Sequence, residues 1–511
     1  MFPFIARRIA AGVIVLLGAT FIVYMAVAFA ADPLAALRTS TSPTRVQQME
    51  RITDLLSLDL PPVVRYFKWL GGAAGYLWGN GTLGMSVVNS QAVSAILGAA
   101  VPTTVKLVAL SVLMAIVLGV VVGIATALRQ YSAFDYLTTF VTFLFYSLPV
   151  FWVAVLLKEF GAIKFNDFLA DPHIGLPTIL AAACCVALIG TLVTGGRWRI
   201  RAFVGGIAFA ATMAVLLYID QTGWLLRPGL GIIGIAITGT CFAVAMVAIS
   251  PGLGNRRGLG AGLTAVALGL AVYFPVQFAL VRPTWLTIAL LALTAVAAGI
   301  AIGWGWGGDD RRSGIRTGIV VALGMGALTF VDRVMQAWPA YVASPRVGGR
   351  PIGTIGAVTP SLGGNFWFAT TDVVTHLVLP TTALVLISFA SYTRYTRSSM
   401  LEVMNADYIR TARAKGLTER VVVVRHAFRN ALIPLATVIP IDVAAVFGGA
   451  VLTERIFSWR GMGTMFLEAL RAGDPGTVMG YFLVTAMLAI GANILADLVY
   501  AWLDPRIRVT S

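Results

Sequence analysis

The chain consists of long apolar runs separated by short segments that carry most of its charge. An α-helix needs about 20 mostly apolar residues to cross the hydrocarbon core of a bilayer. Runs close to that length fall at residues 9–30, 102–128, 136–158, 176–195, 202–219, 229–250, 259–281, 285–306, 317–335, 376–396, 433–453 and 478–502. The pattern predicts an all-α polytopic membrane protein with twelve spans.

The arginine clusters indicate which ends of the spans face the cytoplasm. If the N-terminus is cytoplasmic, the dense clusters at 129–135, 197–201, 255–257 and 309–316 all fall on the cytoplasmic side. Such segments favour that side, because burying one arginine at the centre of a span costs about 2.5–3.5 kcal/mol. We therefore expect both termini in the cytoplasm. The first run, 9–30, is longer than the ~7–15 apolar residues of a signal peptide, so we interpret it as a retained span.

Composition excludes several classes of protein. Of the 511 residues, 58% are apolar and 12% are charged, and the net charge of +15 lies in cytoplasmic loops, which argues against a nucleic-acid partner. Cys184, Cys185 and Cys241 lie in apolar runs, and the three histidines are far apart, so we expect no disulfide and no metal site. The sequence lacks a Gly-Lys dipeptide and hence a P-loop. We expect no catalytic residue, no cofactor in this chain and no enzyme activity.

A cationic segment, DYIRTARAKGLTERVVVVRHAFRNALIP, joins the last two cytoplasmic span ends. Asp407 stands where a short helix would begin, and Arg413 and Lys415 stand near its end, so each charge complements the helix dipole. Gly416 can adopt the left-handed conformation that ends a helix. We predict a short helix at 407–416 on the cytoplasmic face, either a docking element or a solvated loop.

This segment resembles the coupling loop of ABC importer permeases, and specifically that of the dipeptide/oligopeptide (peptide/nickel) family. Other motifs of the family occur in the same order: FIARRIAAGVIVLLGATFIVY, LSLDLPPVVRYFKWL, VPTTVKLVALSVLMAIVLGVVVGIATAL, YSLPVFWVAVLL, RYTRSSMLEVM, VLTERIFSWRGMG and DLVYAWLDPRIR. Together they cover about two thirds of the chain. One departure is Arg410-Thr411-Ala412, where the broad importer pattern has Glu-Ala-Ala; similar substitutions are typical of the peptide branch.

The resemblance implies a peptide importer in a bacterial cytoplasmic membrane. The expected partners are a second permease subunit, two cytoplasmic ATPase subunits that bind ATP and Mg²⁺, an extracytoplasmic substrate-binding protein and membrane lipids. The helix at 407–416 would fit a groove in an ATPase subunit, with Ala412 and Gly416 forming a small surface within it. The residues expected at this contact are Asp407, Tyr408, Arg410, Ala412, Arg413, Lys415, Gly416 and Leu417.

The family has a six-span core of the type I importer kind, and this chain has about six more spans. We predict core segments at 1–159 and 336–511, with the coupling loop at 397–432, and an inserted bundle at 160–335. Because an even number of inserted spans returns the chain to the same side of the membrane, the later core spans keep the orientation that they have in the family. The role of the insertion is open.

Ionisable and small residues in the core spans are candidates for the substrate path. Asp442, Gly448 and Gly449 are the predicted path residues, and Glu454 is a weaker candidate at an outer end. For Asp497 we favour a structural role, with Arg506 or a neighbouring subunit as its partner. The alternative function is a self-sufficient secondary transporter, since twelve spans can arise from two repeated halves. The two halves share no visible motif, and the segment at 407–434 has no counterpart in the first half.

Overall fold

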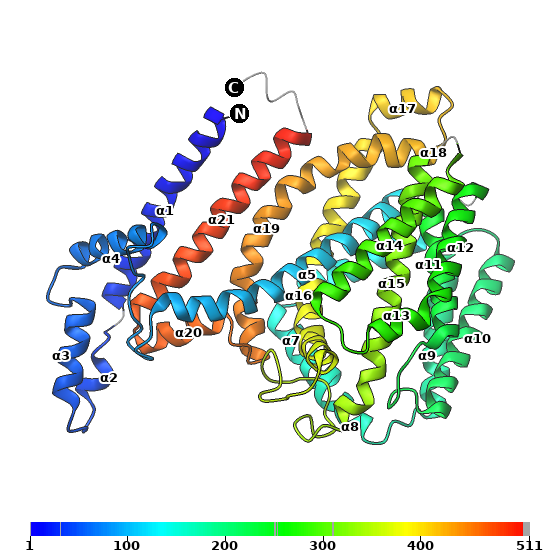
Figure 1. The fold of residues 1–511 in the computed structure, drawn as a ribbon. Coiled ribbons are helices and arrows are strands. Elements are labelled where there is room, and N and C mark those ends of the chain that lie inside the picture. Colours follow the sequence, from blue (N-terminus) through cyan, green and yellow to red (C-terminus); the bar gives the residue numbers. More distant parts are fainter. Residues whose placement is uncertain (1, 31, 250–251, 253, 309–310, 504–511) are drawn as a thin grey trace.

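The computed structural model describes residues 2–30, 32–249, 252, 254–308 and 311–503. Within these residues the secondary structure is helical, apart from one isolated bridge between Met85 and Ala92 (Figure 1). Among the described residues ten helices are long and apolar enough to span a membrane, and the number is twelve if each of two bent helix pairs forms one span. The twelve lie at the predicted runs, so the prediction of an all-α polytopic protein is confirmed.

The core of the molecule is formed by spans from the two ends of the chain. The most extensive helix–helix packing joins α5 to α16, and α21 packs against both α1 and α19. A Cβ atom on Gly119 of α5 would lie 2.6 Å from the Cβ of Tyr392, so glycine is what allows the two backbones to approach. The bounds of the core helices are α1 (Phe2–Ala30), α5 (Val93–Leu128), α16 (Phe366–Met404), α19 (Phe428–Ile456) and α21 (Pro475–Leu503).

Two of the predicted spans are bent, which their apolar runs alone did not indicate. Residues 136–158 divide into α6 (Ala133–Ser147) and α7 (Val150–Lys158), and the axis turns by 97° between them. Pro149 has no N–H and disfavours a helical residue before it, and Leu148 is extended. The second bend, of 54°, separates α12 (Arg256–Ala271) from α13 (Tyr273–Ala279).

The extra spans form a hairpin and a bundle. Helix α9 pairs with α10, while α11, α12, α14 and α15 surround a separate apolar core that includes Ile235, Val321 and Met325. Helix α15 also packs against the core helix α16 and runs through the predicted boundary at 335 without a break. The bounds are α9 (Leu176–Val193), α10 (Trp198–Thr222), α11 (Gly231–Ile249), α14 (Trp285–Trp306) and α15 (Arg311–Val342).

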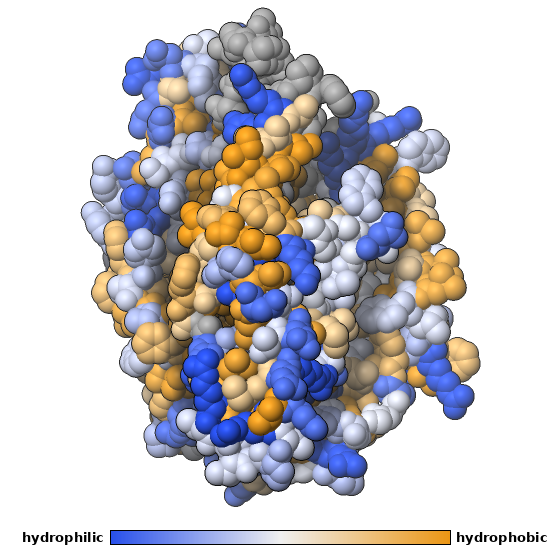
Figure 2. Space-filling model, turned by 90° about the vertical axis from the view of Figure 1, so that its left-hand side faces the viewer, coloured by the Kyte–Doolittle hydropathy of each residue, from blue (hydrophilic) through white to orange (hydrophobic). Residues whose placement is uncertain are grey.

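The short elements lie at the two ends of the spans. In Figure 1, α17, the start of α1 and the end of α21 lie at one end of the molecule, and α2, α3 and α20 lie toward the other. Figure 2 views the side that carries α1 and α3, with hydrophobic residues above and many hydrophilic residues below. The remaining elements are α2 (Ala35–Arg38), α3 (Arg45–Leu56), α4 (Pro62–Leu77), η1 (Glu159–Ile163), α8 (Lys164–Leu169), α17 (Asp407–Ala414), α18 (Glu419–Val421), η3 (Val422–Ala427) and α20 (Met462–Ala472).

Candidate functional site

The predicted short helix is α17, and it ends as the sequence indicates. Gly416 has φ +75°, in the left-handed region. Its N–H donates to the carbonyl of Arg413 over 2.9 Å, and the N–H of Leu417 donates to the carbonyl of Ala412 over 3.4 Å. This pair of bonds is the Schellman motif, which satisfies carbonyls at the end of a helix. The predicted helix and its glycine stop are both confirmed.

Two residues on one side of α17 anchor it to the rest of the chain. Ile409 is fully buried and Ala412, one turn later, is 6% exposed. Both belong to an apolar cluster with Met400 of α16 and with Val422 and Val423 of η3, which leads into α19. The helix is therefore fixed between the end of one core span and the start of the next.

The expectation that Ala412 belongs to an outward-facing surface is wrong. Residues three apart in a helix share a face, so Ala412 turns inward together with Ile409. The other predicted contact residues are exposed and form what we call the α17 surface: Asp407, Tyr408, Arg410, Arg413, Lys415, Gly416 and Leu417.

An ion pair closes the turn after α17. Arg413 donates from Nε to Glu419 Oε2 over 3.1 Å and from a terminal nitrogen to Oε1 over 2.7 Å. These hydrogen bonds raise the pKa of Arg413 and lower the pKa of Glu419. The pair joins α17 to α18, which begins the segment leading into α19.

We expect this pair to contribute little to stability and to depend on pH. Exposed pairs contribute about 0.2–1 kcal/mol. Because folding lowers the pKa of Glu419, the contribution is present above the ordinary value of 4.5 and is lost as the pH falls through the lowered value. Glu419→Gln should thus speed hydrogen exchange of the amides at 413–419 slightly at neutral pH. Well below pH 4.5 the variant and the wild type should exchange alike; a difference that persists there would contradict the assignment.

A second ion pair positions the end of α16, and the sequence analysis did not anticipate it. Arg397 of α16 binds both carboxylate oxygens of Asp135 of α6, over 2.8 and 2.9 Å. The Asp135 side chain is only 4% exposed, and it also accepts the N–H of Tyr131. The two partners are 262 residues apart, so no local pattern could have paired them.

The predicted path residues in α19 do not share one face. Asp442 is half-buried, and no hydrogen bond or ion pair joins its carboxylate to another side chain in the described part of the chain. Gly448 lies on an exposed face with Ile441 and Leu452. Six residues correspond to about 240° around a helix with 3.6 residues per turn, so Asp442 and Gly448 point in different directions. Gly449 also lies in α19.

Asp497 and Glu454 have structural partners. Asp497 pairs with Arg8 of α1 over 3.0 Å; the expected partner Arg506 lies outside the described residues. Glu454 is fully buried and accepts the hydroxyl of Thr104 and the N–H groups of Gly463 and Thr464 at the start of α20. It therefore holds the beginning of α20, and none of its carboxylate oxygens is left free for a substrate.

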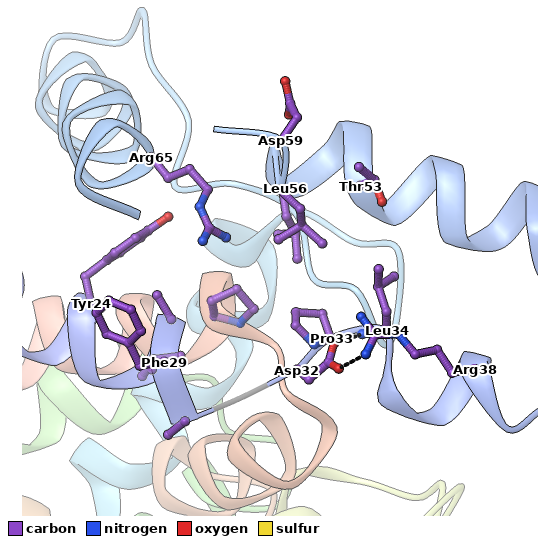
Figure 3. A pocket seen from close by; sticks show the side chains of 15 residues that line it. Tyr24, Phe29, Asp32, Pro33, Leu34, Arg38, Thr53, Leu56, Asp59 and Arg65 are labelled. Carbon is purple, nitrogen blue, oxygen red and sulfur yellow. Dashed lines mark hydrogen bonds and ion pairs between the residues drawn. The ribbon is translucent and has the colours of Figure 1, made fainter. Parts of the chain in front are cut away.

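A pocket of about 580 Å³ is lined by residues of α1, α3 and the start of α21 (Figure 3). In Figure 1 these segments lie at the end of the molecule opposite α17. One wall is apolar, with Phe29, Leu34 and Leu56. In Figure 3 the guanidinium of Arg65 points toward the pocket, while Asp59 points away from it. The lining contains two arginines, Arg38 and Arg65, and two aspartates, Asp32 and Asp59, and Arg38 forms an ion pair with Asp32 over 2.9 Å.

Comparisons with known families match both ends of the chain. A family described as "Binding-protein-dependent transport system inner membrane component" matches residues 314–509. The N-terminal component of such systems matches residues 1–108. The oligopeptide transport system permease protein OppB of Mycobacterium tuberculosis is 35% identical over 240 residues, which cover 46% of this chain and 74% of that relative. The chain belongs to this family of permeases.

Two further relatives match shorter stretches of the permease. A putative peptide permease of Brucella ovis is 41% identical over 192 residues, 38% of this chain and 57% of the relative. The dipeptide transport system permease protein DppB of Escherichia coli K12 is 49% identical over 145 residues, 28% of this chain and 42% of the relative.

Family membership establishes the general class of the protein. It is a multi-pass inner-membrane permease subunit of an ABC importer, and not an enzyme. The two family matches leave residues 109–313 of the permease between them, a stretch that includes helices α9 to α14.

Proposed function

We propose that the permease carries peptides across the bacterial cytoplasmic membrane and is driven through α17 by cytoplasmic ATPase subunits. The observation that carries this proposal is the shape of α17: one turn is fixed to α16 and η3, while seven predicted contact residues remain exposed. Relatives that are themselves oligopeptide and dipeptide permeases support peptides as the cargo.

The position of α17 provides a way to transmit motion. Ile409 shares one apolar cluster with Met400 near the end of α16 and with Val422 in the segment that continues into α19. A displacement of α17 would therefore act on two core spans together. The partner ATPases would bind ATP and Mg²⁺ and supply this displacement when they close. No bond is made or broken by the permease itself.

Other partners would use other surfaces. The exposed face of α19, with Ile441, Gly448 and Leu452, suits a second permease subunit, and the substrate path would run between the two subunits. A substrate-binding protein would deliver peptide at the end opposite α17, where the pocket with Arg65 lies. The proposed segments are a core at 1–159 and 336–511 with an insertion at 160–335. A self-sufficient secondary transporter does not fit a subunit of an ABC importer.

Gly416 gives the most direct test by mutation. A Cβ atom there would meet nothing within 4 Å, so any effect comes from the left-handed backbone or from the exposed surface. Gly416→Arg is expected to reduce co-purification of the ATPase at least about tenfold, since strain of 1–2 kcal/mol adds to a bulky charge in the contact. Affinity purification from native membranes with mass spectrometry measures this loss.

Gly416→Asn is the matched control, because asparagine tolerates the left-handed conformation better than most residues. It should retain most of the ATPase. If the tagged permease is purified without an ATPase even as wild type, the proposed coupling is wrong. If the ATPase is retained but labelled dipeptides and oligopeptides are not taken up, the coupling stands and the proposed cargo is wrong.

A further inference from the structure

The inserted bundle contains an apolar groove of about 610 Å³ that the proposed transport mechanism does not use. It lies between α12, α13, α14 and α15, and α14 and α15 each qualify as membrane spans. Small residues such as Gly269, Ala295 and Gly326 form part of its wall. Because these spans lie in the bilayer, the groove is surrounded by lipid and not by water.

The hydroxyl groups that line the groove are not free to bind a polar ligand. Its threonines are Thr294 and Thr329. Thr294 donates its hydroxyl to the carbonyl of Leu291 and Thr329 donates to the carbonyl of Met325, each over 2.9 Å. Both donors are thus satisfied within their own helices. A hydrocarbon chain matches these walls, whereas a peptide would leave its backbone groups without partners.

One end of the groove has the features of a membrane interface. Trp285 lines the groove and is 74% exposed, and tryptophan is enriched where a span meets the headgroups. Arg282 is exposed, and in the sequence it lies between Leu280 and Trp285, which both line the groove. The carbonyl of Leu280 accepts the indole N–H of Trp367 at the start of α16 over 2.7 Å. Helix α16 begins at this end of the groove and its other end leads to α17, so this end of the groove lies opposite α17.

We infer that the groove binds one phospholipid, with an acyl chain between α12, α14 and α15 and the phosphodiester at Arg282. The apolar wall recognises the chain, and the guanidinium recognises the phosphate. The rings of Trp285 and Phe366 meet at 5.1 Å, edge to face. The lipid thus lies against the contact that joins the insertion to the first residue of α16, and it acts as a structural ligand of that junction.

The test compares two glycine variants of the full-length permease. Gly326 and Gly206 are both exposed in spans, and a Cβ atom on either would meet nothing within 4 Å, but only Gly326 lines the groove. Gly326→Phe fills the groove, and Gly206→Phe in α10 is the matched control. The proteins are reconstituted in phosphatidylcholine vesicles that contain phosphatidylglycerol, extracted in mild detergent and examined by native mass spectrometry.

The wild type and Gly206→Phe should each retain one phospholipid, and Gly326→Phe should retain about tenfold less. Ala295→Leu is a smaller change in the same wall and should lose part of the bound phospholipid. It replaces Gly326→Phe in the test if that variant does not fold. Arg282→Gln should also lose lipid. Equal retention in Gly326→Phe and Gly206→Phe, or a bound molecule other than a phospholipid, would overturn the inference. Unchanged retention in Arg282→Gln would overturn the assignment of the phosphate.

Discussion

A permease in which Ile409 is replaced by aspartate is expected to stay in the membrane but to lose its ATPase subunits and its transport activity. Ile409 is fully buried in the apolar cluster that fixes α17. Burial of such a side chain contributes about 1.5–3 kcal/mol, and an unpaired carboxylate in its place is strongly unfavourable. Ala412, a small residue, is the other anchor of an eight-residue helix, so α17 should detach.

Co-purified ATPase and peptide-stimulated ATP hydrolysis should both fall at least about tenfold in Ile409→Asp. Ile409→Leu, which keeps the burial and nearly the same volume, should retain most of both activities. The effect must be local, so the variant should still be inserted and should still unfold near the wild-type temperature. An intact, active complex with Ile409→Asp would mean that α17 does not need its anchor.

The second large effect is expected at Asp332, a fully buried carboxylate in α15. Its Oδ1 accepts the N–H groups of Leu230 and Gly231 over 2.7 and 3.0 Å, at the start of α11. Its Oδ2 accepts the hydroxyl of Tyr273 over 2.7 Å and amide groups of two glutamines. One side chain thus ties α11 and α13 to α15.

Asp332→Ala should destabilise the inserted bundle by about 3 kcal/mol or more, because each buried donor left without an acceptor costs about 1–3 kcal/mol. Hydrogen exchange at the amides of residues 230–236 and at α13 should accelerate at least about a hundredfold. The control is Arg333→Ala, which removes a hydrogen bond to the side-chain oxygen of Gln336 but leaves the Asp332 carboxylate and its donors in place, so exchange at 230–236 should stay unchanged. Slow exchange in Asp332→Ala would show that packing alone holds the bundle.

The spans could be predicted from the sequence, because the length and hydropathy of an apolar run identify a span without knowledge of its tertiary contacts. It also predicted the end of α17, because Gly416 acts through its own backbone. The bends were not predicted, because the spans were identified from their apolar runs alone; Pro149 is a local signal for the first bend. The pairing of Arg397 with Asp135 depends on how distant helices pack, and so does the inward turn of Ala412.

Photo-crosslinking from the α17 surface in native membranes would show directly whether an ATPase subunit docks there. A photoreactive residue replaces Tyr408, which is 44% exposed; the control position is Val46 of α3, 57% exposed at the opposite end. We expect Tyr408 to crosslink to an ATPase subunit with a yield that changes when ATP is added, and we expect no crosslink from Val46 to that subunit. If Tyr408 crosslinks only to lipid, α17 lies against the lipid headgroups and the permease is not driven through it.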